Sequence, residues 1–115
     1  MDYSRGDVVL VNLGQVEGSE EKGEGRPCVI VQTNIGIEYS PTVIVVPLTD
    51  AKGKKIYPFQ ALISRAKDGV KVDSIAKCEQ IRTIDKRRIV KKVAHVSEET
   101  IKCIDNGIKN VLELP

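Results

Sequence analysis

The sequence predicts a mainly β protein whose short antiparallel strands curl into a small barrel, followed by one C-terminal helix. Several short runs rich in Val and Ile follow one another closely along residues 1–96, and short β-branched runs are typical of strands. No helical periodicity separates these runs, so we expect the strands to pair directly with their neighbours. Residues 97–115 place apolar side chains at helical spacing instead.

The first strand is expected where Val8-Val9-Leu10-Val11 forms an apolar run without alternation, which predicts burial on both faces. Two similar runs follow, separated by a polar turn around Asn34 and Gly36 and by Ser40-Pro41. The expected strands are 7–13, 27–32, 42–48, 57–63, 73–82 and 90–96.

The connection from Gly14 to Arg26 is long for a link between two neighbouring strands, since hairpin loops usually have 2–5 residues. It contains four glycines, Gly14, Gly18, Gly23 and Gly25, and four acidic residues. Glycine permits positive φ and close approach of another backbone. Loops of this length are generally functional or disordered, so the connection is a candidate ligand-binding segment.

The C-terminal helix is expected to begin after Ser97, a good N-cap that precedes Glu98 and Glu99. Its apolar side chains recur at helical spacing, at Ile101, Ile104, Ile108, Val111 and Leu112. One such face predicts that the helix covers the open side of the barrel.

The chain has 115 residues, of which 41% are hydrophobic and 30% charged, so we expect one globular domain spanning 1–115. Its apolar runs fall far short of the roughly 18 residues of a membrane span. No basic segment followed by an apolar stretch opens the chain, which predicts a cytoplasmic protein that does not contact membranes. Cys28, Cys78 and Cys103 lie far apart among apolar neighbours, which favours reduced core thiols.

Basic residues concentrate in the middle of the chain. Residues 1–26 hold six acids and three bases, 27–96 hold six acids and thirteen bases, and 97–115 hold four acids and two bases. Two basic clusters stand out: Arg82, Lys86, Arg87, Arg88, Lys91 and Lys92, and separately Lys52, Lys54 and Lys55. Such clusters attract phosphate, but a run of charge is equally consistent with a solvated face, and charge alone leaves both interpretations open.

Four fragments, at their separations along nearly the whole chain, resemble the MazF/PemK family of toxin endoribonucleases, most closely the MazF-type enzymes of Gram-positive bacteria. They are Arg5-Gly6-Asp7-Val8, the segment from Gly25-Arg26-Pro27 to Gln32, Ser40-Pro41-Thr42 with Pro47-Leu48-Thr49, and the segment from Glu79-Gln80 to Arg88. No single fragment would suffice. The resemblance implies a CcdB/PemK-like SH3-like barrel, a homodimer, a cognate antitoxin, and sequence-selective cleavage of single-stranded RNA without a metal or other cofactor.

The resemblance also assigns the catalytic pair to Arg26 and Thr49, and the chemistry of the two side chains fits. Metal-free RNA cleavage needs donors aimed at the charge that grows on the phosphate oxygens. Arg26 offers a planar fork of donors, and Thr49 offers a hydroxyl. The alternatives are an ion pair of Arg26 with Glu24 or another loop acid, and a Thr49 hydroxyl that caps the turn from Asp50 to Gly53.

Three more residues fall where RNA-contacting residues cluster in the family: Ser19, Glu20 and Gln80. The amide of Gln80 could bind a base edge, although Gln80 could also be an ordinary surface strand residue and Ser19 a solvated loop residue. His95, the only histidine, matches no family motif and is expected to be structural.

Two other functions remain open at this stage. One is a non-enzymatic poison similar to CcdB, which shares the fold and binds DNA gyrase. The other is an SH3-like module that binds nucleic acid or an acidic antitoxin tail without chemistry. The Gly-Arg-Pro motif and the strand-end threonine favour the ribonuclease.

Overall fold

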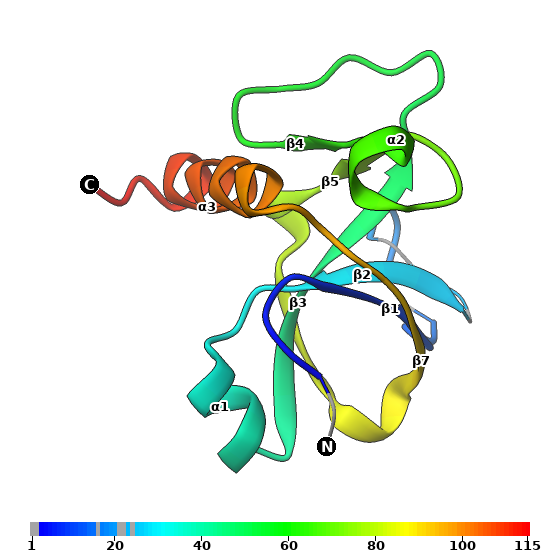
Figure 1. Ribbon diagram of the computed structural model, residues 1–115, viewed down its shortest axis with the longest axis vertical. Coiled ribbons are helices and arrows are strands. Elements are labelled where there is room, and N and C mark those ends of the chain that lie inside the picture. Colours follow the sequence, from blue (N-terminus) through cyan, green and yellow to red (C-terminus); the bar gives the residue numbers. More distant parts are fainter. Residues whose placement is uncertain (1–2, 16, 21–22, 24) are drawn as a thin grey trace.

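The computed structural model describes residues 3–15, 17–20, 23 and 25–115, which form a strongly curled antiparallel sheet with helices at its margins (Figure 1). The strands are β1 (Asp7–Val11), β2 (Arg26–Ile30), β3 (Thr42–Asp50), β4 (Ala61–Ile63), β5 (Ser74–Ala76), β6 (Arg82–Asp85) and β7 (Ile89–His95). The helices are α1 (Asn34–Tyr39), α2 (Arg65–Asp68) and α3 (Glu98–Leu112), with 3-10 turns η1 (Cys78–Gln80) and η2 (Lys86–Arg88). The expected mainly β barrel with a C-terminal helix is confirmed.

The sheet runs in the order β4-β5-β3-β2-β1-β7, and β6 also pairs with β3. β1 is buried on both faces, as its unbroken apolar run predicts, because Val8 contributes to one apolar cluster while Val9 and Val11 contribute to another. β2 and β3 divide their side chains between the same two clusters. The core therefore consists of two apolar layers separated by the central strands.

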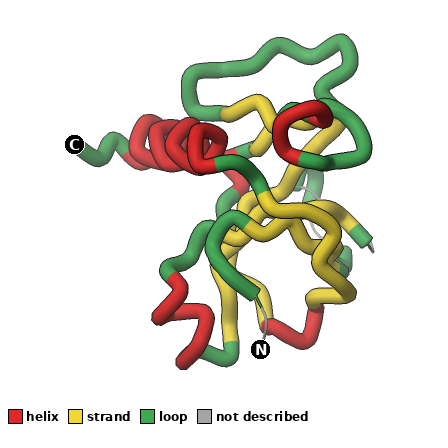
Figure 2. The backbone as a smooth tube through the Cα atoms, viewed as in Figure 1, coloured by secondary structure: helices red, strands yellow, loops and turns green. Residues whose placement is uncertain are grey.

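The prediction that no helix lies between the strands is wrong. Figure 2 shows α1 and α2 interrupting the run of strands. The Thr33 hydroxyl caps α1 by accepting a hydrogen bond from the Gly36 backbone N–H at 3.2 Å. Ile37 is the one buried residue of α1, so a helix this short has no apolar periodicity to detect.

The strand expected at 73–82 is divided into β5 and β6 by η1. β5 and β6 both pair with β3, but their registers differ: Leu48 is opposite Ala76, whereas Val45 is opposite Arg82. The break lies beside Pro47, whose carbonyl accepts from the Lys77 N–H at 2.9 Å. Proline has no N–H to donate in return, so the ladder cannot continue regularly at this position.

The strand expected at 57–63 is also shorter than predicted, since only β4 is extended. A β-turn precedes it, in which the Gln60 N–H donates to the Tyr57 carbonyl at 2.9 Å. Pro58 lies inside this turn and favours it over a paired strand.

The cap predicted for α3 is present, because the Ser97 hydroxyl accepts from the Thr100 N–H at 3.2 Å. A buried carboxylate reinforces it: Asp68 accepts from the Ser97 N–H at 2.8 Å and from the Thr100 hydroxyl at 3.0 Å. α3 packs on β4 and η1 and covers that end of the barrel, as predicted. Leu112 is the exception on its apolar face, because it is exposed near the end of the helix. No helix within the described part of the chain is long and apolar enough to cross a membrane.

Two of the three cysteines are core thiols, and all three are unoxidised. Cys28 and Cys78 are buried, and burial raises the pKa of Cys78 to about 12. The prediction of a core position for Cys103 is wrong, because this residue lies on the exposed side of α3. Cys103 directly precedes Ile104, a buried residue of α3, and is therefore turned by about 100° around the helix axis from it.

The Arg5-Gly6-Asp7 motif has a structural role at the start of β1. Asp7 is fully buried, and its carboxylate accepts from the Ser4 backbone N–H at 2.8 Å and lies 2.7 Å from His95 Nδ1. Burial alone would raise the pKa of Asp7, but the contacts with His95, Ser4 and Lys92 outweigh it and hold the pKa below its usual range. His95 is therefore placed as a partner of β1, which agrees with the expected structural role.

Replacing Asp7 with Asn should destabilise the fold by about 1–3 kcal/mol near neutral pH, because buried donors lose a charged acceptor. The pKa of Asp7 is lowered on folding. Its stabilisation is therefore complete above about pH 4, the unfolded pKa, and is lost as the pH falls through the lower folded pKa. Urea unfolding of both proteins across this range measures the difference. The exposed Glu38→Gln variant is the control, and a difference that stays constant to the lowest pH would contradict the prediction.

Candidate functional site

The sheet puts the two predicted catalytic residues on neighbouring strands. β2 and β3 pair as far as Cys28 opposite Pro47. Arg26 and Thr49 each lie two residues beyond this last pair, at the first position of β2 and near the end of β3. Thr49 is by then paired with Ile75 of β5. The predicted residues therefore flank the point at which β3 passes from its pairing with β2 to its pairing with β5.

Arg26 is half-buried at the first position of β2. A Cβ atom on Gly23 would lie 3.6 Å from Arg26 Cδ, so the loop backbone passes close to the arginine side chain. Gly23 and Gly25 both have positive φ, at 104° and 61°, a conformation that favours glycine. The alternative ion pair with Glu24 falls outside the described residues.

The hydroxyl of Thr49 faces a lysine. Lys54 Nζ donates to Thr49 Oγ1 at 2.9 Å. The alternative role of Thr49 as a turn cap is wrong, because the Asp50 carboxylate caps this turn by accepting from the Lys52 N–H at 2.9 Å. The Thr49 hydroxyl is thus directed to a flexible cation and not to the backbone of the turn.

Thr49 lines a cavity of about 350 Å³. The other described lining residues are Lys54, Lys55, Tyr57, Gln60, Ile75, Lys77 and Glu79. Three lysines face one glutamate, so the cavity carries net positive charge and suits an anion such as a phosphate. We refer to it as the Thr49 cavity.

The three predicted RNA-contacting residues lie together beside a second cavity. Gln80 Nε2 donates to the Ser19 carbonyl at 3.1 Å, and Glu20 accepts from the Glu17 N–H at 3.1 Å. Glu20 and Gln80 line a cavity of about 400 Å³ with Glu79. Because Glu79 also lines the Thr49 cavity, the two cavities adjoin across η1. Arg26 is not among the side chains that line either cavity.

Several residues of the Thr49 cavity carry no sequence signal of a binding site. Lys54 and Lys55 belong to a basic cluster that charge alone leaves open, and Tyr57 lies at the start of the strand expected at 57–63. Lys77 and Glu79 flank Cys78 in a segment predicted to be a continuous strand. The one sequence signal that bears on Lys77 and Glu79 is Pro47, because a proline has no N–H for the strand that pairs with it.

The larger basic cluster is held largely by contacts within the fold. Arg87 pairs with Asp85 at 3.1 Å, and this hydrogen-bonded pairing holds the pKa of Asp85 below its usual range. Arg88 Nη1 lies 3.4 Å from the Asn12 carbonyl, Lys92 Nζ lies 3.4 Å from Asp7, and Lys86 donates to a carbonyl of α1. The cluster at residues 52–55 supplies Lys54 and Lys55 to the Thr49 cavity, and the larger cluster supplies Arg82 to the cavity beside Gln80.

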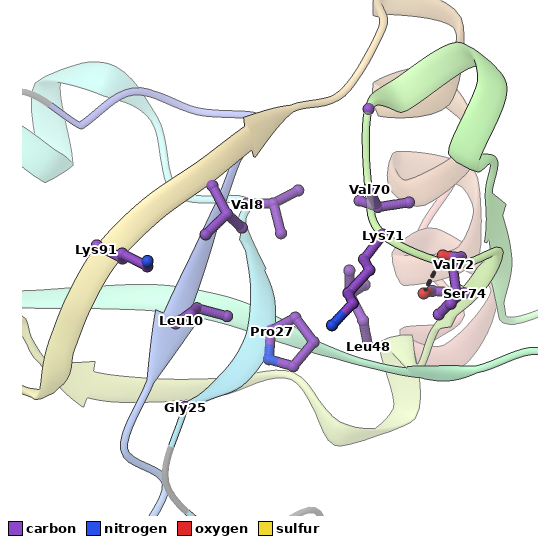
Figure 3. A pocket seen from close by; sticks show the side chains of 12 residues that line it. Val8, Leu10, Gly25, Pro27, Leu48, Val70, Lys71, Val72, Ser74 and Lys91 are labelled. Atoms are coloured by element: carbon purple, nitrogen blue, oxygen red, sulfur yellow. Dashed lines mark hydrogen bonds between the residues drawn. The ribbon is translucent and has the colours of Figure 1, made fainter.

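A third cavity, of about 600 Å³, lies on the opposite face of the central strands. Figure 3 shows Val8, Leu10, Pro27 and Leu48 among its lining residues, with the Lys71 side chain extending toward Pro27 and Leu48 and Lys91 at one side. Exposed Val72 and Val93 extend its apolar lining. Pro27 faces this cavity while its neighbour Arg26 faces the other side, as the alternation of a strand requires.

Comparison with known proteins decides the family. The model of the family described as PemK-like, MazF-like toxins of type II toxin-antitoxin systems matches residues 4–112. The chain belongs to this family. The resemblance derived from the four motifs is thus confirmed, and so is the prediction of a MazF-type toxin endoribonuclease.

Two curated MazF relatives support this assignment. Endoribonuclease MazF of Staphylococcus epidermidis is 43% identical over 104 residues, covering 90% of this chain and 86% of that protein. Endoribonuclease MazF of Staphylococcus saprophyticus is 42% identical over the same shares of the two chains.

Solved structures confirm the MazF fold. MazF of Deinococcus radiodurans superposes with a TM-score of 0.80 at 20% identity, over 97% of this chain and 99% of that chain. An endoribonuclease in complex with its cognate antitoxin from Mycobacterial species gives a TM-score of 0.77 at 21% identity, over 98% and 97% of the two chains.

Proposed function

We propose that this protein cleaves single-stranded RNA at short specific sequences without a metal ion, with Arg26 and Thr49 at the reacting phosphate. The pairing of β2 and β3 supports the proposal, because it puts Arg26 and Thr49 on neighbouring strands just beyond their last paired residues, and Thr49 lines a lysine-rich cavity. The 2′-OH of the RNA attacks the adjacent phosphorus and the bond to the 5′-oxygen breaks. The products are a 2′,3′-cyclic phosphate and a 5′-hydroxyl.

Arg26 and Thr49 act as donors in this reaction. The guanidinium binds the phosphate oxygens bidentately, and the hydroxyl donates to the same group as negative charge grows on it. Lys54, whose ammonium already contacts Thr49 Oγ1, adds positive charge. Arg26 does not accept the proton of the 2′-OH, because a guanidinium keeps its charge in proteins and has no acceptor atom. Water takes that proton and supplies one to the leaving oxygen.

The bases of the substrate are held on the other side of η1. Ser19, Glu20 and Gln80 lie together there, and single-stranded RNA exposes base edges that side-chain amides and carboxylates can read. We assign sequence selection to these residues.

The positive charge of the Thr49 cavity also suits a protein partner with an acidic segment. We propose a cognate antitoxin whose acidic segment docks over the Thr49 cavity, because a site for phosphate also attracts carboxylates. A structure in which an antitoxin is bound to a related endoribonuclease supports this partner.

Arg26→Ala and Thr49→Val should each lower the rate of RNA cleavage by on the order of 100-fold or more, since each removes a donor to the transition state. The assay incubates a long single-stranded RNA with each protein in EDTA and maps the ends of the fragments. Arg65→Ala, which removes an exposed arginine of α2, is the control, and circular dichroism confirms that each variant is folded.

Cleavage that survives in both variants would remove Arg26 and Thr49 from the mechanism. Binding of RNA without cleavage by the unchanged protein would favour the nucleic-acid-binding module. Binding of DNA gyrase without any RNA cleavage would favour the CcdB-like poison.

Salt should weaken the binding of both RNA and the antitoxin to the Thr49 cavity. We expect affinity for a single-stranded RNA with a 2′-deoxy group at the cleavage site to fall on the order of tenfold between about 50 and 200 mM KCl, because phosphate binding releases counterions. Affinity for the cognate antitoxin should fall in the same direction. Fluorescence anisotropy measures both, and an antitoxin affinity independent of salt would contradict the electrostatic part of the proposal.

We also propose that the protein is a homodimer. The apolar cavity of Figure 3, together with exposed Val72 and Val93, offers a surface that a second copy could cover. Light scattering at micromolar concentration should give twice the mass of the chain, and Val93→Glu should shift the mass toward that of one chain. A single-chain mass for the unchanged protein would exclude the dimer.

A further inference from the structure

Two aromatic side chains stack beside the Thr49 cavity. The rings of Tyr57 and Phe59 have centroids 5.6 Å apart and are inclined by only 7°. Tyr57 lines the cavity and is 45% exposed. The chain has only four aromatic residues, which on the sequence alone argues against a stacking platform. The fold nevertheless puts two of the four in parallel contact at the candidate site.

The segment that carries this pair is fixed by hydrogen bonds at Gln60. The Tyr57 N–H donates to Gln60 Oε1 at 3.1 Å, and the Gln60 N–H donates to the Tyr57 carbonyl at 2.9 Å. Gln60 Nε2 in turn donates to Glu79 Oε2 at 2.8 Å. The aromatic segment is thereby joined to η1, which also carries Gln80.

Helix α3 supports the same segment from behind. Asn110 Nδ2 donates to the Pro58 carbonyl at 2.9 Å. Gly107 lets the helix approach closely, because a Cβ atom there would lie 3.1 Å from the Phe59 carbonyl oxygen. The connection between β3 and β4, which contains these aromatic residues, lies along the α3 side of the molecule (Figure 1).

We propose that Tyr57, backed by Phe59, is a stacking platform for a nucleobase adjacent to the phosphate at Thr49. The inference rests on the proposed ribonuclease function and adds a base-binding subsite to it. Every nucleobase has a π-face, so an aromatic ring binds it by stacking with little dependence on sequence. Lys55 Nζ lies over the Tyr57 ring, 5.3 Å from its centroid. The base takes the place of this flexible ammonium on the ring, and the ammonium moves to the adjacent phosphate.

Ring removal is the direct test. Tyr57→Leu should lower kcat/KM for a single-stranded RNA by about 5- to 150-fold, the range expected for loss of one stacked base. Tyr57→Phe keeps the ring and should stay within about twofold of the unchanged protein. Tyr39→Leu is the matched control, because Tyr39 is 79% exposed on α1, at the other end of the molecule from β4 (Figure 1).

A spectroscopic measurement separates stacking from a general loss of structure. A 2-aminopurine placed in turn at each position flanking the cleavage site, in an RNA with a 2′-deoxy group at the scissile position, should be quenched at one position on binding. The quenching should persist in Tyr57→Phe and Tyr39→Leu and disappear in Tyr57→Leu.

The outcomes distinguish this inference from the function on which it rests. Cleavage by the unchanged protein with equal kcat/KM and equal quenching in Tyr57→Leu would overturn the stacking platform and leave the ribonuclease intact. No cleavage and no binding of RNA by the unchanged protein would overturn both.

Discussion

The missing N–H of Pro47 determines how the candidate site is assembled. Pro47 interrupts the hydrogen bonding along the edge of β3 that pairs with β5 and β6. Between these two strands the chain forms η1. As a result, the register of β6 on β3 differs by three residues from the register of β5 on β3. In an uninterrupted strand, Glu79 and Gln80 would point to opposite faces of the sheet. In η1 both line the same cavity, and Glu79 also reaches the Thr49 cavity. The interruption of this ladder thus brings the Thr49 cavity and the cavity beside Gln80 together at Glu79.

The two basic clusters of the chain have different surroundings in the structure. The cations of residues 82–92 are largely occupied by carbonyls and carboxylates of neighbouring elements, including buried Asp7. The lysines of the connection between β3 and β4 face the Thr49 cavity instead. Four cations of the larger cluster therefore contact the fold, whereas Lys54 and Lys55 of the smaller cluster line the Thr49 cavity. Whether a cation contacts the fold or lines the cavity depends on where it lies relative to the strands.

Much of the fold could be predicted because its signals are local. The unbroken run of β1 and the Ser97 cap of α3 each specify one element, and the structure contains both. The placement of Arg26 and Thr49 on neighbouring strands depends on the pairing of β2 with β3, which no single segment encodes, and only the family motifs pointed to these two residues. Hydrophobic periodicity could not predict the short helix α1, the break at η1 or the stacked pair of Tyr57 and Phe59. These features depend on tertiary contacts, such as that of Gly107 with Phe59.

The burial of two cysteines gives the protein a single position for chemical labelling. Cys28 and Cys78 are sealed in the two apolar layers, and Cys78 keeps its proton well beyond neutral pH. Cys103 alone presents its sulfur to solvent, on the outer side of α3. A maleimide dye would therefore attach to the unmodified natural sequence at one defined residue, outside the side chains that line the Thr49 cavity. Energy transfer from that dye to a labelled RNA end could then report the polarity of the bound strand.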